Sequence, residues 1–432
     1  MCCKYGSASL ACGRKSGKLM TETALSKSDN AASPLLLIAA GASAALFVAN
    51  LYYAQPLLTT IAADIHIHPQ YAGAVVGASQ LGYGMGLFLL VPLVDIIENR
   101  RLVLTCIVLT LIGIVGVACA SSALTFLFCA LVIGIFSSGA QVLIPYLSLM
   151  IPKARLGRVM GSVMSGILAS VMFARPFALF AAAAWGWRSV YILSAAATAV
   201  LGVALWWIMP PRQPQVRIAY WRTIVSMFAL FVAETPVWRR TMYQAVLFGC
   251  FTMFWATFPI LLAEHFGFGK PAIGLFALVG AGGVLAAPLA GRIAERGAIR
   301  TGTIVAALCV SGAFLCSALS VQFGAPFGIA LMALWLAATS LVIDGSIQVS
   351  QVLSRIVVLE VPPEVRGRIN AVYMTVIFLC GAIGSAFGVT IYYHAGWLAV
   401  ATVGMVGGLV VFMAALAEGQ TVFRLSKKDE AA

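Results

Sequence analysis

Two charged residues lie inside runs that carry no other charge. Arg175 interrupts ASVMFARPFALFAAAAW, residues 169–185, and Asp344 interrupts LVIDGSIQVSQ, residues 341–351. A charge at the centre of a bilayer costs on the order of several kcal/mol, so such residues usually pair with one another or serve a function. Asp344 could bind and release a proton during a transport cycle, or it could be a fixed counter-ion.

The elements that must position these residues are membrane-spanning helices. The chain of 432 residues is 62% hydrophobic and 9% charged, whereas a soluble domain has about 25% charged residues. Crossing the hydrocarbon core takes about 20 apolar residues. Twelve stretches fit, some shortened by glycine: 35–62, 71–94, 102–120, 124–150, 159–184, 189–209, 241–263, 272–290, 302–321, 325–354, 370–393 and 397–416. The fold class predicted is an all-α polytopic membrane protein with twelve transmembrane helices.

Basic residues predict how these helices are oriented. With the N-terminus in the cytoplasm, 24 of the 27 Lys and Arg fall on the cytoplasmic side; Arg188 and Lys270 fall outside and Arg175 stays in the membrane. This is the positive-inside pattern, and it predicts an integral protein of the cytoplasmic (inner) membrane with both termini in the cytoplasm. The net charge of +13 therefore reflects orientation in the lipid bilayer and does not indicate a nucleic-acid partner. The polar first 33 residues lack an apolar core, so we expect no cleaved signal peptide.

The sequence favours neither a metal centre nor a cofactor. Seven of the ten cysteines lie in apolar runs, where cysteine usually packs as a small apolar residue, and no pair has metal-ligand spacing. A metal site can be drawn at the outer face from Asp64, His66, His68, Glu264 and His265, but loop histidines are far more often solvated. The chain also lacks a nucleotide-binding loop, so ATP is not the expected driving force.

The two halves of the chain resemble each other. The segment GRVMGSVMSGILASVMFARPFALFAAAAWGW (157–187) aligns without a gap on GRINAVYMTVIFLCGAIGSAFGVTIYYHAGW (367–397), an offset of 367 − 157 = 210. Gly-Arg and Gly-Trp coincide at the two boundaries, and Ser385 takes the position of Arg175. Internal duplication is common in transporters, and it predicts two six-helix bundles in parallel repeat.

Helix geometry puts Arg175 and Asp344 at similar depths. Arg175 lies 18 residues beyond Gly157, about 27 Å along a helix. By the repeat offset Asp344 corresponds to Gly134, which lies 16 residues before Met150, or about 24 Å. We therefore predict an Arg175–Asp344 charge pair between the halves, made in one conformation and loosened by protonation or substrate in another. The alternative is a permanent pair that fixes the halves together.

Polar residues on four predicted helices are candidates for a substrate cavity. Asp344, Gln348 and Gln351 follow at i, i+4 and i+7 and so share one helix face. The full candidate set is Asn50, Tyr52, Tyr53, Gln55, Ser138, Gln141, Thr252, Trp255, Gln348 and Gln351. Interhelical hydrogen bonding is the alternative for each single residue, and the stripe as a whole favours a cavity.

Three further segments resemble the major facilitator superfamily (MFS). They are NLYYAQPLL, PLVDIIENRR and PPEVRGRINAVYM, and they are similar to a bacterial subgroup described as drug:proton antiporter-like. The resemblance covers essentially the whole chain. It implies the MFS fold, in which spans 1, 4, 7 and 10 line a central cavity and spans 2, 5, 8 and 11 form the moving interface. The arginine in span 4 and the acid in span 1 that drug:proton antiporters often carry are not present, so coupling would rest on Asp344.

The same resemblance implies a cytoplasmic gate in the loops after spans 2 and 8. The family signature is a glycine, an acid four residues on, and arginines after it. The second loop has Gly291, Glu295 and Arg296. The first has Asp95, Arg100 and Arg101, but Val91 stands at the glycine position.

The function predicted is secondary active transport of a small organic solute by alternating access, as proton-coupled efflux with the proton gradient as driving force. Alternatives are a proton-independent facilitator or an importer of the same fold, a membrane sensor without transport, and an intramembrane enzyme. The sequence places one acid and no histidine at membrane depth, so we expect no enzyme and no catalytic residues. The predicted divisions are a cytoplasmic tail (1–33), a first bundle (34–210), a cytoplasmic loop with a short amphipathic helix (211–240), a second bundle (241–416) and a second tail (417–432). We expect a monomer.

Overall fold

The computed structural model describes residues 33–213, 220–323 and 328–418, and over these ranges all regular structure is helical. In chain order the helices are α2 (Pro34–Ala49), η1 (Gln55–Leu57), α3 (Leu58–Asp64), η2 (Pro69–Tyr71), α4 (Ala74–Leu90), η3 (Val91–Asp95), α5 (Asn99–Ala118), α6 (Ala123–Ser137), α7 (Ala140–Met150), α8 (Lys153–Trp185), α9 (Trp187–Ile208), α10 (Tyr220–Ala233), α11 (Thr235–Glu264), α12 (Lys270–Ala281), η4 (Gly282–Ala286), α13 (Ala287–Glu295), α14 (Ile299–Phe323), α15 (Gly328–Leu359) and α16 (Pro363–Ala417).

The predicted class, an all-α polytopic membrane protein, is confirmed. Within the described ranges, ten helical segments are long and apolar enough to cross a membrane. The longest, α16, has 55 residues and bends at Gly396, where φ is 73°, so it contains two of the predicted spans. The first predicted span begins with α2, which has 16 residues.

Several predicted spans are broken and not continuous helices. The stretch 35–62 consists of α2, a turn, η1 and α3, and the stretch 124–150 consists of α6 and α7. The first break follows from Pro56, because proline has no N–H to donate and its ring clashes with the carbonyl four residues earlier. Irregular backbone at membrane depth is tolerated where protein surrounds it, and Gln55, beside the proline, is 1% exposed.

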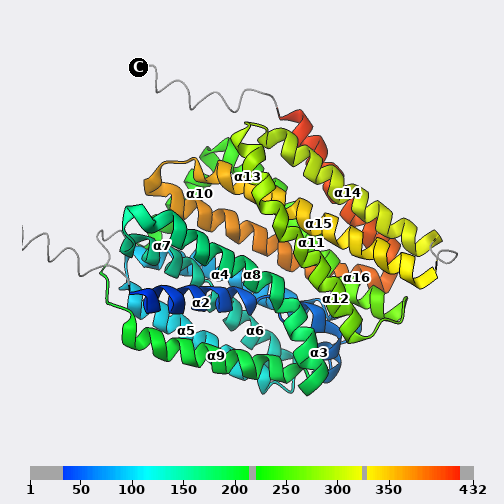
Figure 1. The fold of residues 1–432 in the computed structure, drawn as a ribbon, viewed down its shortest axis with the longest axis horizontal. Coiled ribbons are helices and arrows are strands. Elements are labelled where there is room, and N and C mark those ends of the chain that lie inside the picture. Colours follow the sequence, from blue (N-terminus) through cyan, green and yellow to red (C-terminus); the bar gives the residue numbers. More distant parts are fainter. Residues whose placement is uncertain (1–32, 214–219, 324–327, 419–432) are drawn as a thin grey trace, which may run out of the picture.

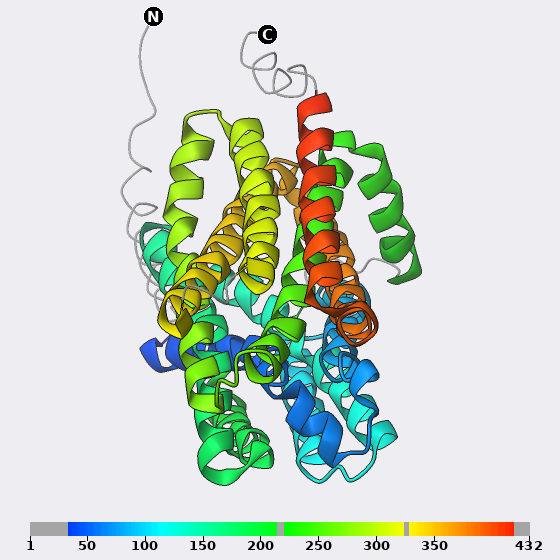
Figure 2. The same cartoon turned by 90° about the vertical axis from the view of Figure 1, so that its right-hand side faces the viewer.

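The helices form two groups that meet along one side (Figures 1 and 2). The first group, coloured blue to green, contains α2 to α9, and the second, from green to red, contains α11 to α16. Helix α8 packs on α12, and α4 packs on α16, so these four helices form the interface between the groups. Helix α10 contacts α11 and α16 of the second group and η3 of the first.

The internal repeat is visible in the backbone. Pro152 and Pro362 are the N-caps of α8 and of α16, with φ/ψ of −56°/139° and −51°/141°. Gly186 and Gly396 have φ of 81° and 73°. Both pairs are separated by 210 residues, the offset of the sequence repeat. Left-handed φ values favour glycine, which explains why both halves keep a Gly-Trp pair where the direction of the chain changes.

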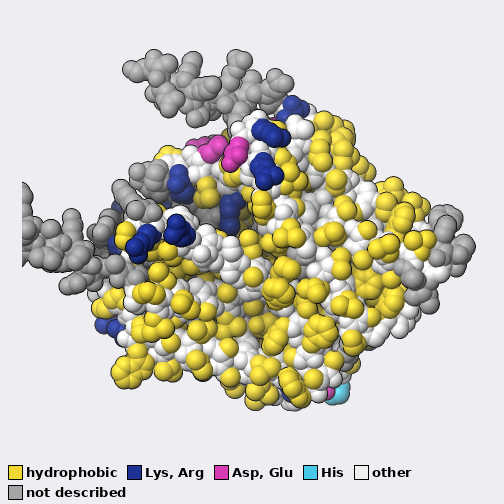
Figure 3. Space-filling view, in the orientation of Figure 1, with side chains coloured by type: hydrophobic (Ala, Val, Ile, Leu, Met, Phe, Trp, Pro, Cys, Tyr) yellow, Lys and Arg dark blue, Asp and Glu magenta, His cyan; other side chains and the backbone are white. Residues whose placement is uncertain are grey.

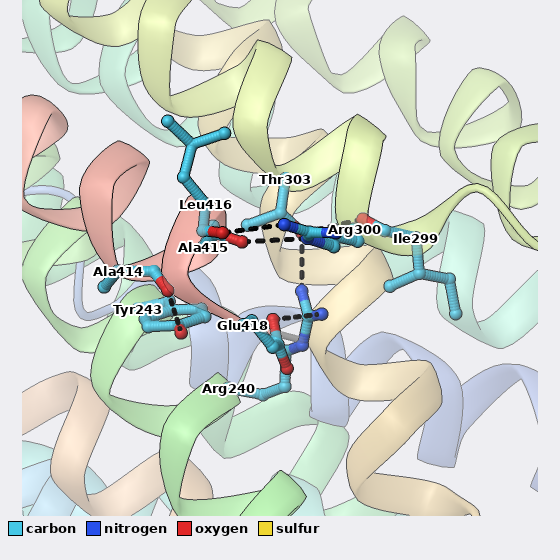
Figure 4. Close-up of polar contacts among 9 residues, drawn as sticks. All are labelled: Arg240, Tyr243, Ile299, Arg300, Thr303, Ala414, Ala415, Leu416 and Glu418. Atoms are coloured by element: carbon cyan, nitrogen blue, oxygen red, sulfur yellow. Dashed lines mark hydrogen bonds and ion pairs between the residues drawn. The ribbon is translucent and has the colours of Figure 1, made fainter. Parts of the chain in front are cut away.

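Helix α11 begins before the predicted span. The sequence places residues 211–240 in a loop, but α11 starts at Thr235, so Arg240 is helical and only 2% exposed. Its guanidinium donates hydrogen bonds to Thr303 Oγ1 at 2.7 Å and to Glu418 Oε2 at 2.9 Å (Figure 4). A charge is tolerated here because an acid and a hydroxyl satisfy it.

Arg240 and Arg300 together hold the end of α16. Arg300 donates to the carbonyl oxygens of Ala415 and Leu416 at 3.0 and 2.7 Å, which have no partner within the helix. In Figure 4 both arginines point at this terminus from α11 and α14. Cations at a helix C-terminus are also favoured by the helix dipole.

We expect Glu418→Ala to destabilise the protein by about 3–5 kcal/mol, because it leaves the buried Arg240 charge without its acid. Thermal unfolding of purified protein in detergent measures this. The control is Arg101→Ala: the Arg101 side chain is 80% exposed in its pair with Glu98, and an exposed pair contributes about 0–1 kcal/mol. Equal effects of the two substitutions would contradict a structural role for Arg240 and Glu418.

Candidate functional site

The two groups of helices touch closely at one end and separate at the other. At the packed end, a Cβ on Gly73 would lie within 2.2 Å of the Ser385 carbonyl oxygen, and one on Gly274 would lie 3.6 Å from Leu179 Cβ. Thr390 donates across the same interface to the carbonyl of Gln70 at 2.9 Å.

At the opposite end, which we call the open end, the interface helices lack these contacts. A Cβ on Gly157, Gly161 or Gly166 of α8 would meet no described atom within 4 Å. Of residues 155–170 only Val163 is buried. Figure 3 shows Lys and Arg side chains gathered at the upper left, where the two groups diverge. Helix α2 begins here after its N-cap Ser33, and α16 ends here before Glu418.

Arg175 and Asp344 meet between the two groups. Arg175 Nη1 lies 3.8 Å from Asp344 Oδ2, and the two side chains are 2% and 9% exposed. This exceeds the ~2.7–2.9 Å of a charge-assisted hydrogen bond, so the pair is an ionic contact without a direct hydrogen bond. Arg175 is on α8 of the first group and Asp344 on α15 of the second, so the pair joins the groups.

Each member of the pair is held by a second residue from its own group. Asp344 Oδ1 accepts a hydrogen bond from Trp255 Nε1 of α11 at 2.7 Å. Arg175 Nε donates to Gln55 Oε1 at 2.9 Å. Gln55 reaches this position because the first span is broken before Pro56. The break therefore places an amide beside the arginine.

Aromatic rings enclose the Arg175 guanidinium. Its Cζ lies 4.5 Å from the ring centre of Trp255, 5.1 Å from that of Phe251 and 5.4 Å from that of Tyr52. Cation–π attraction at these distances contributes about 0.5–2 kcal/mol for each favourable ring. The rings stabilise the charge, and they offer flat apolar surfaces beside it.

Two glycines, Gly280 of α12 and Gly283 of η4, pack directly against this site. A Cβ on Gly280 would lie 2.5 Å from Trp255 Cζ2, and one on Gly283 would lie 2.7 Å from Asp344 Cβ. Larger residues would push the tryptophan or the acid out of place. These glycines position the pair, and the sequence interpretation did not single them out.

The predicted cavity residues separate into two sets. Tyr52, Gln55 and Trp255 surround the charge pair, as described above. Five of the others contact residues elsewhere: Asn50 accepts a hydrogen bond from Ser194, Tyr53 packs against Phe177, Ser138 donates to the Ile135 carbonyl, Gln141 donates to Tyr83, and Thr252 donates to the Gly381 carbonyl. Gln348 and Gln351 are half-buried and have no hydrogen-bond partner among the described residues. Asn50 and Thr252 thus make the interhelical bonds that were the alternative to cavity lining.

Tyr83 and Phe378 also face each other across the interface, with ring centres 4.5 Å apart. Neither was predicted. Tyr83 accepts the hydrogen bond of Gln141 at 3.3 Å, so the predicted glutamine reaches the interface through a tyrosine. The sequence feature that could have identified Tyr83 is a tyrosine in the middle of an apolar span.

The gate residues whose side chains the structure describes form no ion pair between the groups in this conformation. Arg100 donates to the carbonyl of Trp206 at 2.6 Å and Arg101 pairs with Glu98, both within the first group. Glu295 and Arg296 are exposed and Gly291 is half-buried at the open end. Asp95 closes η3. Because the groups are apart here, a gate between them would have to form in another conformation.

The acids of the predicted outer face are engaged by protein groups. Asp64 accepts hydrogen bonds from Arg188 and Trp187, and the contact with Arg188 holds the pKa of this carboxyl below its usual value. Glu264 accepts from Tyr392 and Tyr393 at 3.3 and 3.2 Å. No group of three or more His, Cys, Asp or Glu within the described ranges could hold a metal ion.

Comparison with known proteins identifies the family. The model of the Major Facilitator Superfamily matches residues 40–385. The chain belongs to the major facilitator superfamily. MFS proteins are transporters, so this chain is a secondary transporter of a small solute and not an enzyme.

Among MFS relatives, the chain is 33% identical over 391 residues to the uncharacterized transporter YgaY of Escherichia coli, strains K12 and O157:H7, covering 89% of this chain and 97% of that protein. It is 30% identical to the Streptomyces coelicolor protein named "Probable transporter SCO4007", covering 85% and 84%. The fold is similar to the crystal structure of a bacterial homologue of the human lysosomal transporter Spinster in an inward-facing, unoccupied conformation. There the TM-score is 0.68 at 14% identity, covering 89% and 98% of the chains. The predicted MFS fold is thereby confirmed.

Proposed function

We propose that this MFS protein transports a small organic solute by alternating access, with proton coupling through Arg175 and Asp344. The observation that carries the proposal is the ion pair itself. It joins the two groups of helices where the packed end meets the open end. Protonation of Asp344 would remove the negative charge that holds Arg175 and would loosen this contact.

The orientation follows from the charges. Lys and Arg gather at the open end (Figure 3), and cytoplasmic loops carry an excess of these residues. We therefore assign the open end and both termini to the cytoplasm. In this assignment the structure is an inward-open state, closed to the outside by the packed end, in which the Arg175–Asp344 contact is made.

The pair allows two forms of coupling. The resemblance to drug:proton antiporters favours efflux, in which an outgoing solute is exchanged for an incoming proton. Uptake, in which solute and proton move together, uses the same pair. A facilitator would not depend on Asp344. In each case one chain suffices for the site, because every residue of it lies in this chain.

The test is flux in proteoliposomes with an imposed pH gradient, screened across drugs, sugars, amino acids and organic acids. We expect at least one solute to be accumulated or expelled against its gradient when the pH gradient is present, and not after a protonophore is added. If the flux of every transported solute is independent of the pH gradient, the protein is a facilitator and the proposed proton coupling is wrong.

The alternating-access step has its own test at Gly73. A valine there would collide with the Ser385 carbonyl, so we expect Gly73→Val to open the packed end. A cysteine introduced at Ala382, which is 9% exposed, should then be labelled several-fold faster by a polar thiol reagent, with the native cysteines replaced.

The matched control is Gly161→Val, at the open end. A Cβ there meets no described atom within 4 Å, so this state accepts it, while a state closed at the cytoplasmic side would not. We expect Gly161→Val to slow labelling at residue 382. Unchanged labelling in both variants would mean that the halves do not rock about this interface.

A further inference from the structure

The charge-pair site contains more hydrogen-bond donors than acceptors. Arg175 Nη2 and Gln55 Nε2 are buried, and neither has a hydrogen-bond partner among the described residues. Both side chains are at least 98% buried, with exposures of 2% and 1%. A buried polar group left unsatisfied costs about 1–3 kcal/mol, and more if it is charged. These two donors therefore indicate a ligand that accepts hydrogen bonds.

The orientation of the Gln55 amide is fixed by its neighbour. Arg175 Nε can only donate, so the atom of Gln55 that lies 2.9 Å from it is the oxygen. The Nε2 group that remains is also a donor. Asp344 does not meet this need, because its nearest oxygen is 3.8 Å from Nη1 and its other oxygen already accepts from Trp255.

We propose that the transported solute is an organic anion whose carboxylate binds Arg175 Nη2 and Gln55 Nε2, with its apolar part against the rings of Trp255, Phe251 and Tyr52. A carboxylate matches the planar guanidinium, which can donate two parallel hydrogen bonds to it. A cation would meet only the Asp344 carboxylate and would face the arginine charge. This inference rests on the proposed transport function and adds the class of the solute.

The sign of the coupling follows from the charges. An anion on Arg175 lies close to Asp344, and two negative charges at one site disfavour each other. A proton on Asp344 removes this repulsion and also frees Arg175. Solute anion and proton therefore bind together, and the pair makes the protein a cotransporter of an acid, in contrast to the exchange seen in drug:proton antiporters.

The test compares carboxylates with their own amides. Purified protein is unfolded thermally with indole-3-acetate or indole-3-acetamide, benzoate or benzamide, and hexanoate or hexanamide, at equal millimolar concentrations. Ligand that binds only the folded state raises the unfolding midpoint. We expect at least one carboxylate to raise it while its amide does not, and the shift to grow from mildly alkaline to mildly acidic buffer. No difference within any of the three pairs would overturn the proposal.

The variant Arg175→Lys tests whether carboxylate binding needs the planar guanidinium group or only a positive charge. It keeps the charge and loses the planar fork, so we expect carboxylate affinity to fall at least tenfold in the folded variant. Arg188→Lys, at the packed end and outside the site, is the control and should bind like the wild type. Equal affinity in all three proteins would also overturn the proposal.

The inference and the proposed function can fail separately. If carboxylate binding depends on Arg175 but flux does not respond to the pH gradient, the solute is an organic anion and transport is not proton-coupled. If amines or neutral solutes show proton-coupled flux and no carboxylate binds, transport is proton-coupled and the solute is not an organic anion.

Discussion

Asp344→Asn is expected to abolish proton-driven transport. The asparagine oxygen can still accept the hydrogen bond from Trp255 Nε1, now 2.7 Å from Asp344 Oδ1, so the local packing should survive. The variant loses stability because Arg175 is left without its acid, so flux is normalised to the amount of folded protein. The side chain can no longer gain or lose a proton, and the Arg175 contact is permanently weakened. In proteoliposomes we expect concentrative flux to fall to the level seen without a pH gradient, a loss of at least tenfold, while downhill exchange of solute persists.

The control for this substitution is Glu264→Gln. Glu264 is another acid of the second group, the last residue of α11. It accepts hydrogen bonds from Tyr392 and Tyr393 and lies away from the interface pair. We expect coupled flux in this variant to match the wild type. Full proton-driven transport in Asp344→Asn would contradict the proposed role of the acid.

Arg175→Leu is expected to destabilise the protein strongly. Removing one partner of a buried ion pair costs about 3–5 kcal/mol, because the other charge is left uncompensated. The cation–π contacts with three rings and the Gln55 hydrogen bond are lost as well. The measurement is thermal or denaturant unfolding of purified protein in detergent, together with the amount of folded protein recovered from membranes.

The double variant Arg175→Leu/Asp344→Asn shows whether the charges are the cause. Replacing both members of a buried pair is often neutral or stabilising, so we expect it to recover at least half of the stability lost in the single variant. It should remain inactive in proton-driven transport. A double variant as unstable as the sum of its parts would mean that packing around Arg175, and not the unpaired acid, explains the loss.

The charge pair could be predicted because charges are rare in apolar spans. A duplicated sequence gave a common depth scale for Arg175 and Asp344, and burial in a membrane leaves few other partners for either. The same argument could not find Gln55 as the third member. Its place depends on a helix break at Pro56, and a proline within a span often only kinks the helix.

Other features depend on contacts between distant residues, which hydropathy does not contain. Arg240 falls just outside an apolar window, and its partner Glu418 lies 178 residues away, so a loop was the natural interpretation. Asn50 and Thr252 are polar residues on predicted cavity helices, but the rotation of each helix turns them toward neighbours in their own group. The positions of Gly280 and Gly283 against Trp255 and Asp344 likewise require the packed structure.

The most direct test of the central claim is the distance across the open end as a function of pH. Spin labels at Leu149 of the first group and Leu289 of the second, which are 60% and 53% exposed near the open end, report how far the groups are separated, without any solute. Protonation of Asp344 should weaken the contact that favours this state. We therefore predict that acidification shifts the wild-type distances toward shorter values, and that Asp344→Asn shows the short distances at every pH. Wild-type distances that ignore pH, or an Asp344→Asn variant that still responds to it, would contradict coupling through this pair.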